Sequence, residues 1–315
     1  MNTKRLYIQN HEPIEFKFKQ SIDTFYVEEI PLRQFSKKGN ILIIKIKKQY
    51  TSTWELIHHI SDVLEVPENQ IGYAGLKDKS ATTIQYISVP LKQGKNYKDL
   101  NTNKIKVLDT FLHNQKLKIG DLSGNRFKIV LQDINPDDLT TIYQTISQIQ
   151  KNGMPNYFGY QRFGTETTFE QCKDIVYGET FTNDKKLKHL QVSAYQSYFF
   201  NGWLAKRVEI SKEQNSNKLV SLEGDLFFDR EKTTISGLMP GRKAMRSTAK
   251  AREIEKEFDD EFIHEKGSRR ASWIKPQNIK NKFNKEENTL ELTFTMPKSS
   301  YATVFIENIA NKNLR

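Results

Sequence analysis

The sequence has one cysteine, no long apolar run and no apolar stretch near its start. Cys172 alone excludes an intramolecular disulfide and a multi-cysteine zinc site. No run approaches the eighteen or so apolar residues that a membrane-spanning helix needs. Residues 1–16 also lack the apolar core of a secretory signal. These absences predict a cytoplasmic protein that does not associate with membranes.

Positive charge is in excess over the 315 residues. Lys and Arg number 49 against 38 Asp and Glu, which gives a net charge of +11. The basic residues are dispersed and have aromatic residues between them, a pattern that favours a folded nucleic-acid-binding surface over a membrane anchor. A surface that only keeps the protein in solution has the same charge, so the charge alone leaves both interpretations open.

Hydrophobic periodicity predicts an α+β protein. The 19 Phe, 13 Tyr and 3 Trp are too many for a disordered chain. Alternating or continuous apolar residues predict strands at 14–19, 41–46, 71–76, 83–89, 117–119, 127–131 and 289–295. Helices are expected after the capping box of Ser52 and Glu55, at 136–151, within 167–211 and at 302–310.

The late strand at 289–295 suggests that the chain returns to the sheet with which it began. The simplest layout is a sheet domain formed by 1–153 and 286–315, with 154–285 inserted as a second, mostly helical domain. The charged residues 212–285 are assigned to that helical insertion.

The segment 72–83, GYAGLKDKSATT, carries the clearest chemical signal. Its two glycines allow a sharp turn between apolar strands. The turn presents Asp78 between Lys77 and Lys79, and nearby cations keep a carboxylate ionised, ready to act as a nucleophile or a base. Taken alone, such a segment is more often a polar turn with a surface ion pair.

Five segments in order resemble the pseudouridine synthase D family, often called TruD. The segment 72–89 is similar to its catalytic motif, and 154–164, MPNYFGYQRFG, to its most specific signature. The other three matches are 24–29 (TFYVEE, with Lys19 upstream), 117–127 (LKIGDLSGNRF) and 296–303 (MPKSSYAT). The resemblance implies a mixed, mainly antiparallel pseudouridine-synthase sheet with an inserted family-specific domain.

The same resemblance implies an isomerase that converts uridine to pseudouridine in tRNA, at position thirteen in bacterial members. It assigns the essential carboxylate to Asp78, which either attacks C1′ or removes the C2′ proton. Lys19 or Lys77 could hold that carboxylate, and Lys79 is a weaker choice. The reaction gains no group or electron, so no cofactor is expected. The histidines do not cluster at metal-ligand spacing, so no metal site is expected either.

The resemblance also places Phe25, Asn125, Phe127 and Tyr301 in the substrate pocket. The Asn125 amide can both donate and accept, which suits the edge of uracil. Phe25 and Phe127 could equally be core residues of the sheet. Tyr301 stands where most members carry Phe.

Three interpretations therefore remain. The first is a tRNA pseudouridine synthase, acting as a monomer that needs no protein partner. The second is a non-catalytic RNA-binding protein or tRNA-folding chaperone on the same scaffold. The third is a family member that acts on another RNA, because RNA shape determines the target. Asp78 favours an enzyme, since a protein that only binds RNA does not need this carboxylate.

Overall fold

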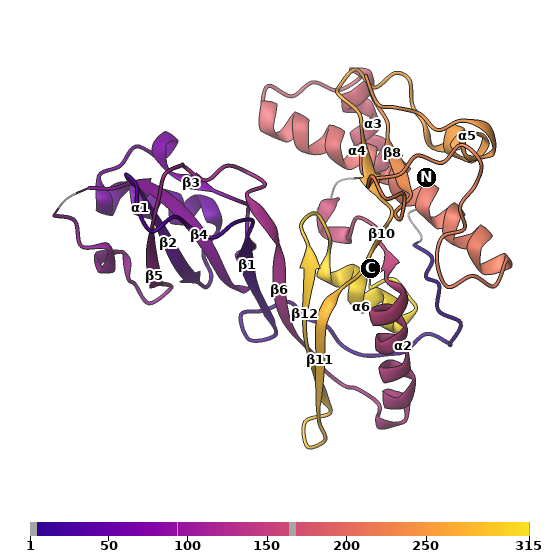
Figure 1. The fold of residues 1–315 in the computed structure, drawn as a ribbon, viewed down its shortest axis with the longest axis horizontal. Coiled ribbons are helices and arrows are strands. Elements are labelled where there is room, and N and C mark those ends of the chain that lie inside the picture. Colours follow the sequence, from indigo (N-terminus) through magenta and orange to yellow (C-terminus); the bar gives the residue numbers. More distant parts are fainter. Residues whose placement is uncertain (1–4, 93, 164–167, 315) are drawn as a thin grey trace. The chain divides into compact units, whose positions relative to one another are not determined.

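The computed structural model describes residues 5–92, 94–163 and 168–314. The chain divides into two compact units, coloured along the sequence in Figure 1. The sheet unit consists of Glu15–Asp137 and Gln277–Ser299. The second unit consists of Met1–Ile14, Asp138–Pro276 and Ser300–Arg315. These boundaries differ from the domains expected from the sequence, 1–153 with 286–315 and 154–285, because 138–153 and 300–315 pack with the second unit.

One eight-stranded sheet forms the frame of the sheet unit. Its strands are β1 (Phe25–Pro31), β2 (Ile41–Lys48), β3 (Gly72–Tyr73), β4 (Thr82–Pro90), β5 (Ile105–His113), β6 (Leu122–Leu131), β11 (Gln277–Asn284) and β12 (Thr289–Pro297). The order is β11-β12-β6-β1-β4-β2-β5, with β3 paired to β4. The β1–β4 pair is parallel and the other pairs of this sheet are antiparallel. The mixed, mainly antiparallel sheet and the late strand that joins it are confirmed.

Helix α1 (Thr53–Leu64) covers one face of this sheet, here called the α1 face. Ser52 and Glu55 form the expected capping box at its start. Ile57 and Ile60 are buried as predicted, whereas Trp54 is about half exposed. The helix packs on residues of one alternation of β2, including Ile44 and Ile46. Two short 3₁₀ helices, Glu68–Gln70 and Tyr97–Leu100, lie in the connections that follow.

The second unit contains most of the helical residues. Its helices are α2 (Leu139–Asn152), α3 (Phe169–Tyr177), α4 (Lys185–Glu213), α5 (Ala249–Glu255) and α6 (Ala302–Ala310). Every residue of α6 is buried, and its Glu307 binds Arg5 and Tyr7 near the start of the chain. Two small sheets pair β7 (Met154–Pro155) with β10 (Trp273–Ile274) and β8 (Ser236–Met239) with β9 (Ser268–Ala271).

Some expectations about secondary structure are wrong, and some strands were not expected. Residues 14–19 form only an isolated bridge, between Lys17 and Gln132, and 117–119 are loop. Strands β1, β5 and β11 were not predicted. Strand β5 lies at a sheet edge and only one of its residues is buried, so its apolar alternation is weak. The segment 212–285 holds short strands as well as α5, since its charged composition does not distinguish the two kinds of element.

Candidate active site

The turn between β3 and β4 carries Asp78 and is fixed to both the helix and the sheet. The backbone N–H of Lys77 donates to Thr53 Oγ1 at 2.9 Å. The Thr53 hydroxyl in turn donates to Gln85 Oε1 on β4 at 3.2 Å. Thr53 and Gln85 are both buried. The start of α1 therefore connects the turn to the α1 face of the sheet.

A buried ion pair joins the same turn to β1. Lys77 Nζ lies 2.8 Å from Glu29 Oε1, and the two side chains are 9% and 1% exposed. The other carboxylate oxygen of Glu29 accepts the backbone N–H of Tyr86 at 3.0 Å. Because both of its carboxylate oxygens have partners, the Glu29 side chain is held in one conformation. Lys77 can reach this carboxylate only when the turn adopts the conformation seen in the structure.

Asp78 is exposed, and its carboxylate accepts one hydrogen bond from Gln20 Nε2 at 3.2 Å. Lys79 binds Glu55 at 2.7 Å, and this contact holds the pKa of the Glu55 carboxyl at about 2. Within the described residues, no ion pair joins Lys77, Lys79 or the exposed Lys19 to the Asp78 carboxylate. The two lysines of the turn therefore shape it by binding glutamates, and the Asp78 carboxylate is left accessible to a substrate.

The α1 face also presents three of the pocket residues expected from the sequence. In the β1–β6 register, Glu29 pairs with Asn125 and Val27 with Phe127, and Phe25 follows the same alternation. Residues paired in this way project from one face of a sheet. The structure therefore brings Phe25, Asn125 and Phe127 together on the face over which the Asp78 turn is held.

Aromatic rings line part of this face. The Phe127 ring centroid lies 6.1 Å from that of Phe25 and 5.4 Å from that of Phe294, with the last pair nearly parallel. Phe25 and Phe127 are both buried. They belong to the core, and they also form an apolar wall beside the polar groups of the face.

Besides Glu29 Oε1, which forms the ion pair with Lys77, three buried polar atoms on the α1 face have no hydrogen-bond partner in the described part of the chain. They are Asn125 Oδ1, Thr83 Oγ1 and Gln85 Nε2. Buried polar groups are nearly always satisfied, and an unsatisfied one costs about 1–3 kcal/mol. Two unpaired acceptor oxygens and one unpaired donor group suit a ligand that itself has N–H and C=O groups.

Tyr301 belongs to the second unit and is described there. It precedes α6, and its ring lies 5.9 Å from that of Phe158. Burial raises the pKa of its phenol. Phe158 lies in the 154–164 signature, where Arg270 stacks on its ring at 3.9 Å and Arg162 donates to Ser197 Oγ. Gly164, the last residue of that signature, lies outside the described residues.

Sequence reasoning missed several groups that support the turn. Glu29 lies within a recognised motif but was given no role, and Thr53 and Gln20 carried no signal. Lys48 did carry a signal in the sequence. It lies two and four positions after Ile46 and Ile44 on β2, so its side chain is on the same face as theirs and points inward. No group of three or more metal-ligating side chains occurs among the described residues, and no helix there is long and apolar enough to cross a membrane.

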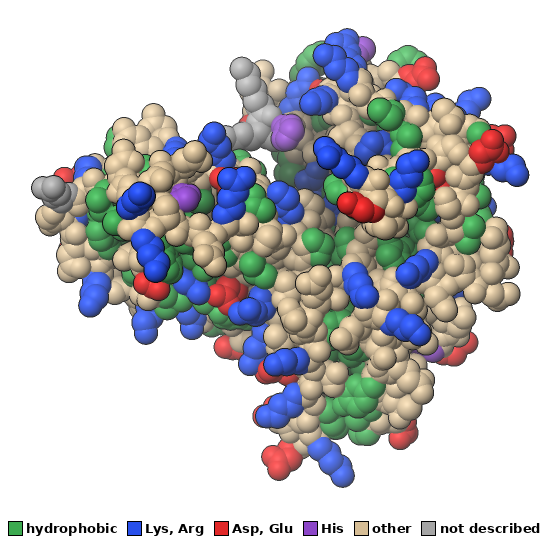
Figure 2. All heavy atoms as spheres, in the orientation of Figure 1, with side chains coloured by type: hydrophobic (Ala, Val, Ile, Leu, Met, Phe, Trp, Pro, Cys, Tyr) green, Lys and Arg blue, Asp and Glu red, His purple; other side chains and the backbone are tan. Residues whose placement is uncertain are grey.

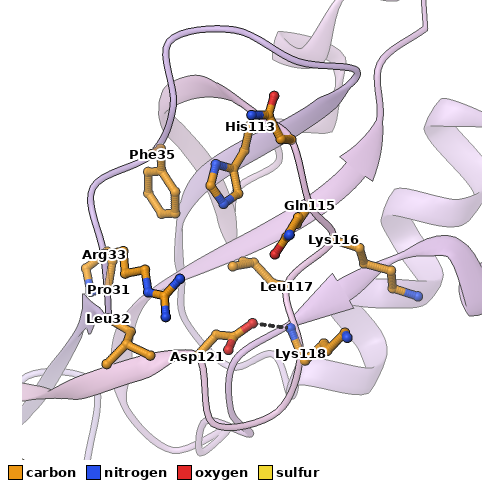
Figure 3. A pocket seen from close by; sticks show the side chains of 11 residues that line it. Pro31, Leu32, Arg33, Phe35, His113, Gln115, Lys116, Leu117, Lys118 and Asp121 are labelled. Carbon is orange, nitrogen blue, oxygen red and sulfur yellow. Dashed lines mark hydrogen bonds between the residues drawn. The ribbon is translucent and has the colours of Figure 1, made fainter.

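A hollow lies between the loop after β1 and the connection after β5 (Figure 3). Its volume is about 410 Å³, and its lining consists of Pro31, Leu32, Arg33, Phe35, His113, Asn114, Gln115, Lys116, Leu117, Lys118 and Asp121. The one carboxylate in this lining, that of Asp121, accepts a hydrogen bond from the backbone N–H of Lys118 at 2.8 Å. Arg33, Lys116 and Lys118 leave this basic pocket positively charged.

Comparisons with known proteins agree with this fold. The family model of tRNA pseudouridine synthase D matches residues 2–182 and 182–309. Proteins named tRNA pseudouridine synthase D from Nitratiruptor sp. and Sulfurimonas denitrificans are each 38% identical, with 98–99% of this chain and 99% of theirs aligned. A relative of that name from Helicobacter pylori is 35% identical, with 98% of this chain and 96% of the relative aligned.

A solved structure from Methanosarcina mazei with the same family name has a TM-score of 0.72 and 23% identity, over 98% of this chain and 96% of that one. Its likeness bears on the fold. Together with the family model, it identifies the α+β fold as that of a pseudouridine-synthase type of protein. The family model and the curated relatives make the narrower assignment: the chain belongs to the tRNA pseudouridine synthase D family.

We predict that Lys77 and Lys79 contribute very differently to stability. Lys77→Met leaves the buried Glu29 carboxylate without its cation and should lower the free energy of unfolding by about 3–5 kcal/mol. Lys79→Met breaks an exposed pair and should cost less than about 1 kcal/mol. Urea unfolding of the two variants measures both values. Equal losses would show that the Lys77–Glu29 pair does not fix the turn.

Proposed function

We propose that this protein is a tRNA pseudouridine synthase that isomerises uridine 13, with Asp78 as its essential carboxylate. One observation carries the proposal. An exposed carboxylate lies on a turn held by a buried ion pair, over a sheet face with aromatic rings and an unsatisfied amide oxygen. The names of relatives that align over nearly the whole chain support the reaction and the substrate class.

The reaction rearranges bonds within one nucleotide. The bond between C1′ and N1 breaks, the uracil turns, and C1′ bonds to C5. The C5 proton is then lost and N1 gains one, so atoms and electrons balance without a cofactor. Asp78 serves either by attacking C1′ or by taking the C2′ proton, and both routes need its ionised form. The exposed carboxylate, with one contact from Gln20, is free to approach the sugar.

The α1 face supplies what a displaced base needs. Taking a base out of its stack costs a few kcal/mol, which contacts in the pocket must offset. The amide of Asn125 has a free oxygen that can accept the N3–H of uracil. The rings of Phe25 and Phe127 provide apolar surface beside it. A substrate-binding role for Tyr301 rests on the family resemblance alone.

The surface suits a polyanionic partner. Figure 2 shows Lys and Arg side chains spread over the visible face, with fewer acidic ones among them. The basic pocket adds Arg33, Lys116 and Lys118 on the sheet unit. We take tRNA as the partner and the cytoplasm as the location. We take the monomer as the active form, because every group named above comes from one chain.

Asp78→Asn should abolish isomerisation without weakening tRNA binding. The amide is nearly isosteric but cannot attack a sugar carbon or take a proton. Removing a negative charge should leave affinity for RNA equal or slightly higher. Single-turnover assays, with pseudouridine detected by carbodiimide-dependent reverse-transcription stops, measure the first effect, and filter binding measures the second.

Asp109→Asn is the matched control, since Asp109 is an exposed residue on β5 with the same charge. It should keep the wild-type rate. A measurable rate for Asp78→Asn, with deamidation excluded by mass spectrometry, would disprove the role of Asp78. A protein that binds tRNA but produces no pseudouridine in any variant would instead be the non-catalytic RNA-binding protein.

Phe127→Ala should slow turnover more than its neighbour Phe294→Ala. Both rings are buried and stacked on each other, so each loss should cost about 3–5 kcal/mol of stability. Only Phe127 is expected to touch the base, and loss of stacking is worth about 1–3 kcal/mol, or roughly 5- to 150-fold in rate. The rate per folded molecule, measured below both melting temperatures, tests this. Equal rates would make Phe127 a core residue only.

Neutralising the basic pocket should weaken tRNA binding and its salt dependence. The double variant Arg33→Ala/Lys118→Ala removes two cations and should reduce the slope of log affinity against log salt by about two. Lys104→Ala/Lys106→Ala removes the same charge from exposed positions outside the pocket and should change the slope less. The same loss in both variants would mean that the pocket is not a specific contact.

A further inference from the structure

Lys48 places a charged group in the interior of the sheet unit. It is the last residue of β2, it points to the α1 face, and it is 1% exposed. Its ammonium group donates to the carbonyl oxygen of Thr51 at 2.5 Å and lies 3.4 Å from the carbonyl oxygens of Lys77 and Asp78. A lysine ammonium has three N–H donors, so these three carbonyls can use all of them.

The surroundings of Lys48 keep it close to losing its proton. Burial lowers the pKa of this ammonium to about 8. Among the charged groups around it, the nearby Asp78, Glu29 and Glu55 carboxylates favour the proton, and the Lys77 ammonium opposes it. With that pKa, about nine-tenths of the molecules still carry the charge at pH 7.

A buried ammonium without a carboxylate in direct contact is costly, and an apolar side chain of similar length would avoid that cost. Stability alone therefore does not account for a lysine here. Two of its three contacts end on the backbone of the catalytic turn, at Lys77 and Asp78 themselves. The Lys48 ammonium therefore holds the peptide groups of Lys77 and Asp78 at a fixed distance from β2.

We propose that Lys48 is a positioning residue for Asp78, whose protonated ammonium fixes the turn so that the carboxylate meets the sugar. This inference rests on the proposed function. It adds a third support to those from Glu29 and Thr53. The Lys48 side chain is largely protonated below pH 8 and loses its proton as the pH rises through that value. Positioning of Asp78 should therefore weaken on the alkaline side.

The test compares Lys48→Met with the wild type in single-turnover isomerisation of tRNA from about pH 6 to pH 10. Methionine fills the same space without charge. At pH 7 it should react about 10- to 100-fold more slowly, the effect of misplacing a reacting group by about 1 Å. Affinity for tRNA should change less than about twofold, because Lys48 is buried and does not face RNA. Lys47→Met, the adjacent residue on the opposite face, is the control and should keep the wild-type rate.

The pH profile separates positioning from a structural role. The wild-type rate should fall above about pH 8, and Lys48→Met should lack that fall. Lys48→Arg stays charged at every pH used, so its rate should also not fall near pH 8. An equal rate for Lys48→Met and wild type, an unchanged alkaline midpoint in either variant, or a wild type without the fall would overturn the inference. A wild type that makes no pseudouridine at all would instead refute the proposed function.

Discussion

The rest of the site depends on the buried ion pair between Glu29 and Lys77. The sheet is a rigid frame, whereas the turn that carries Asp78 is short and exposed at its tip. An ion pair at 2.8 Å with both side chains out of water is strong enough to set the place of such a turn, because breaking it leaves an uncompensated charge. The Asp78 carboxylate, which we propose to be catalytic, therefore stays accessible while its backbone is fixed.

The order of strands explains why this arrangement works. β1 lies between β4 and β6, so Glu29 is next to both the strand that follows the turn and the strand that carries Asn125. The parallel β1–β4 pair is what brings a segment from early in the chain beside the turn. The turn and the residues proposed to recognise the base are thus held by adjacent strands of one sheet.

The sequence predicted the frame of this site better than its supports. Apolar runs and alternation predicted β2, β4 and β12, and the motif in 72–89 pointed to Asp78, because both are local properties of the chain. Glu29, Thr53 and Lys48 all contact Lys77, which lies 24 to 48 positions further along the chain. Which partner a charged side chain finds depends on the order of the strands. For that reason Lys19 or Lys77, and less so Lys79, was expected to hold Asp78, whereas the structure pairs Lys77 with Glu29 and Lys79 with Glu55.

The most direct test of this account is a double-mutant cycle on the Glu29–Lys77 pair, with Glu29→Gln, Lys77→Met and both together. The quantity measured is the single-turnover rate of pseudouridine formation per folded molecule. If the two side chains act as one support for the turn, the double variant should be no slower than the slower single variant, which gives a coupling of about 0.5–3 kcal/mol. Rate losses that simply add in the double variant would contradict the account.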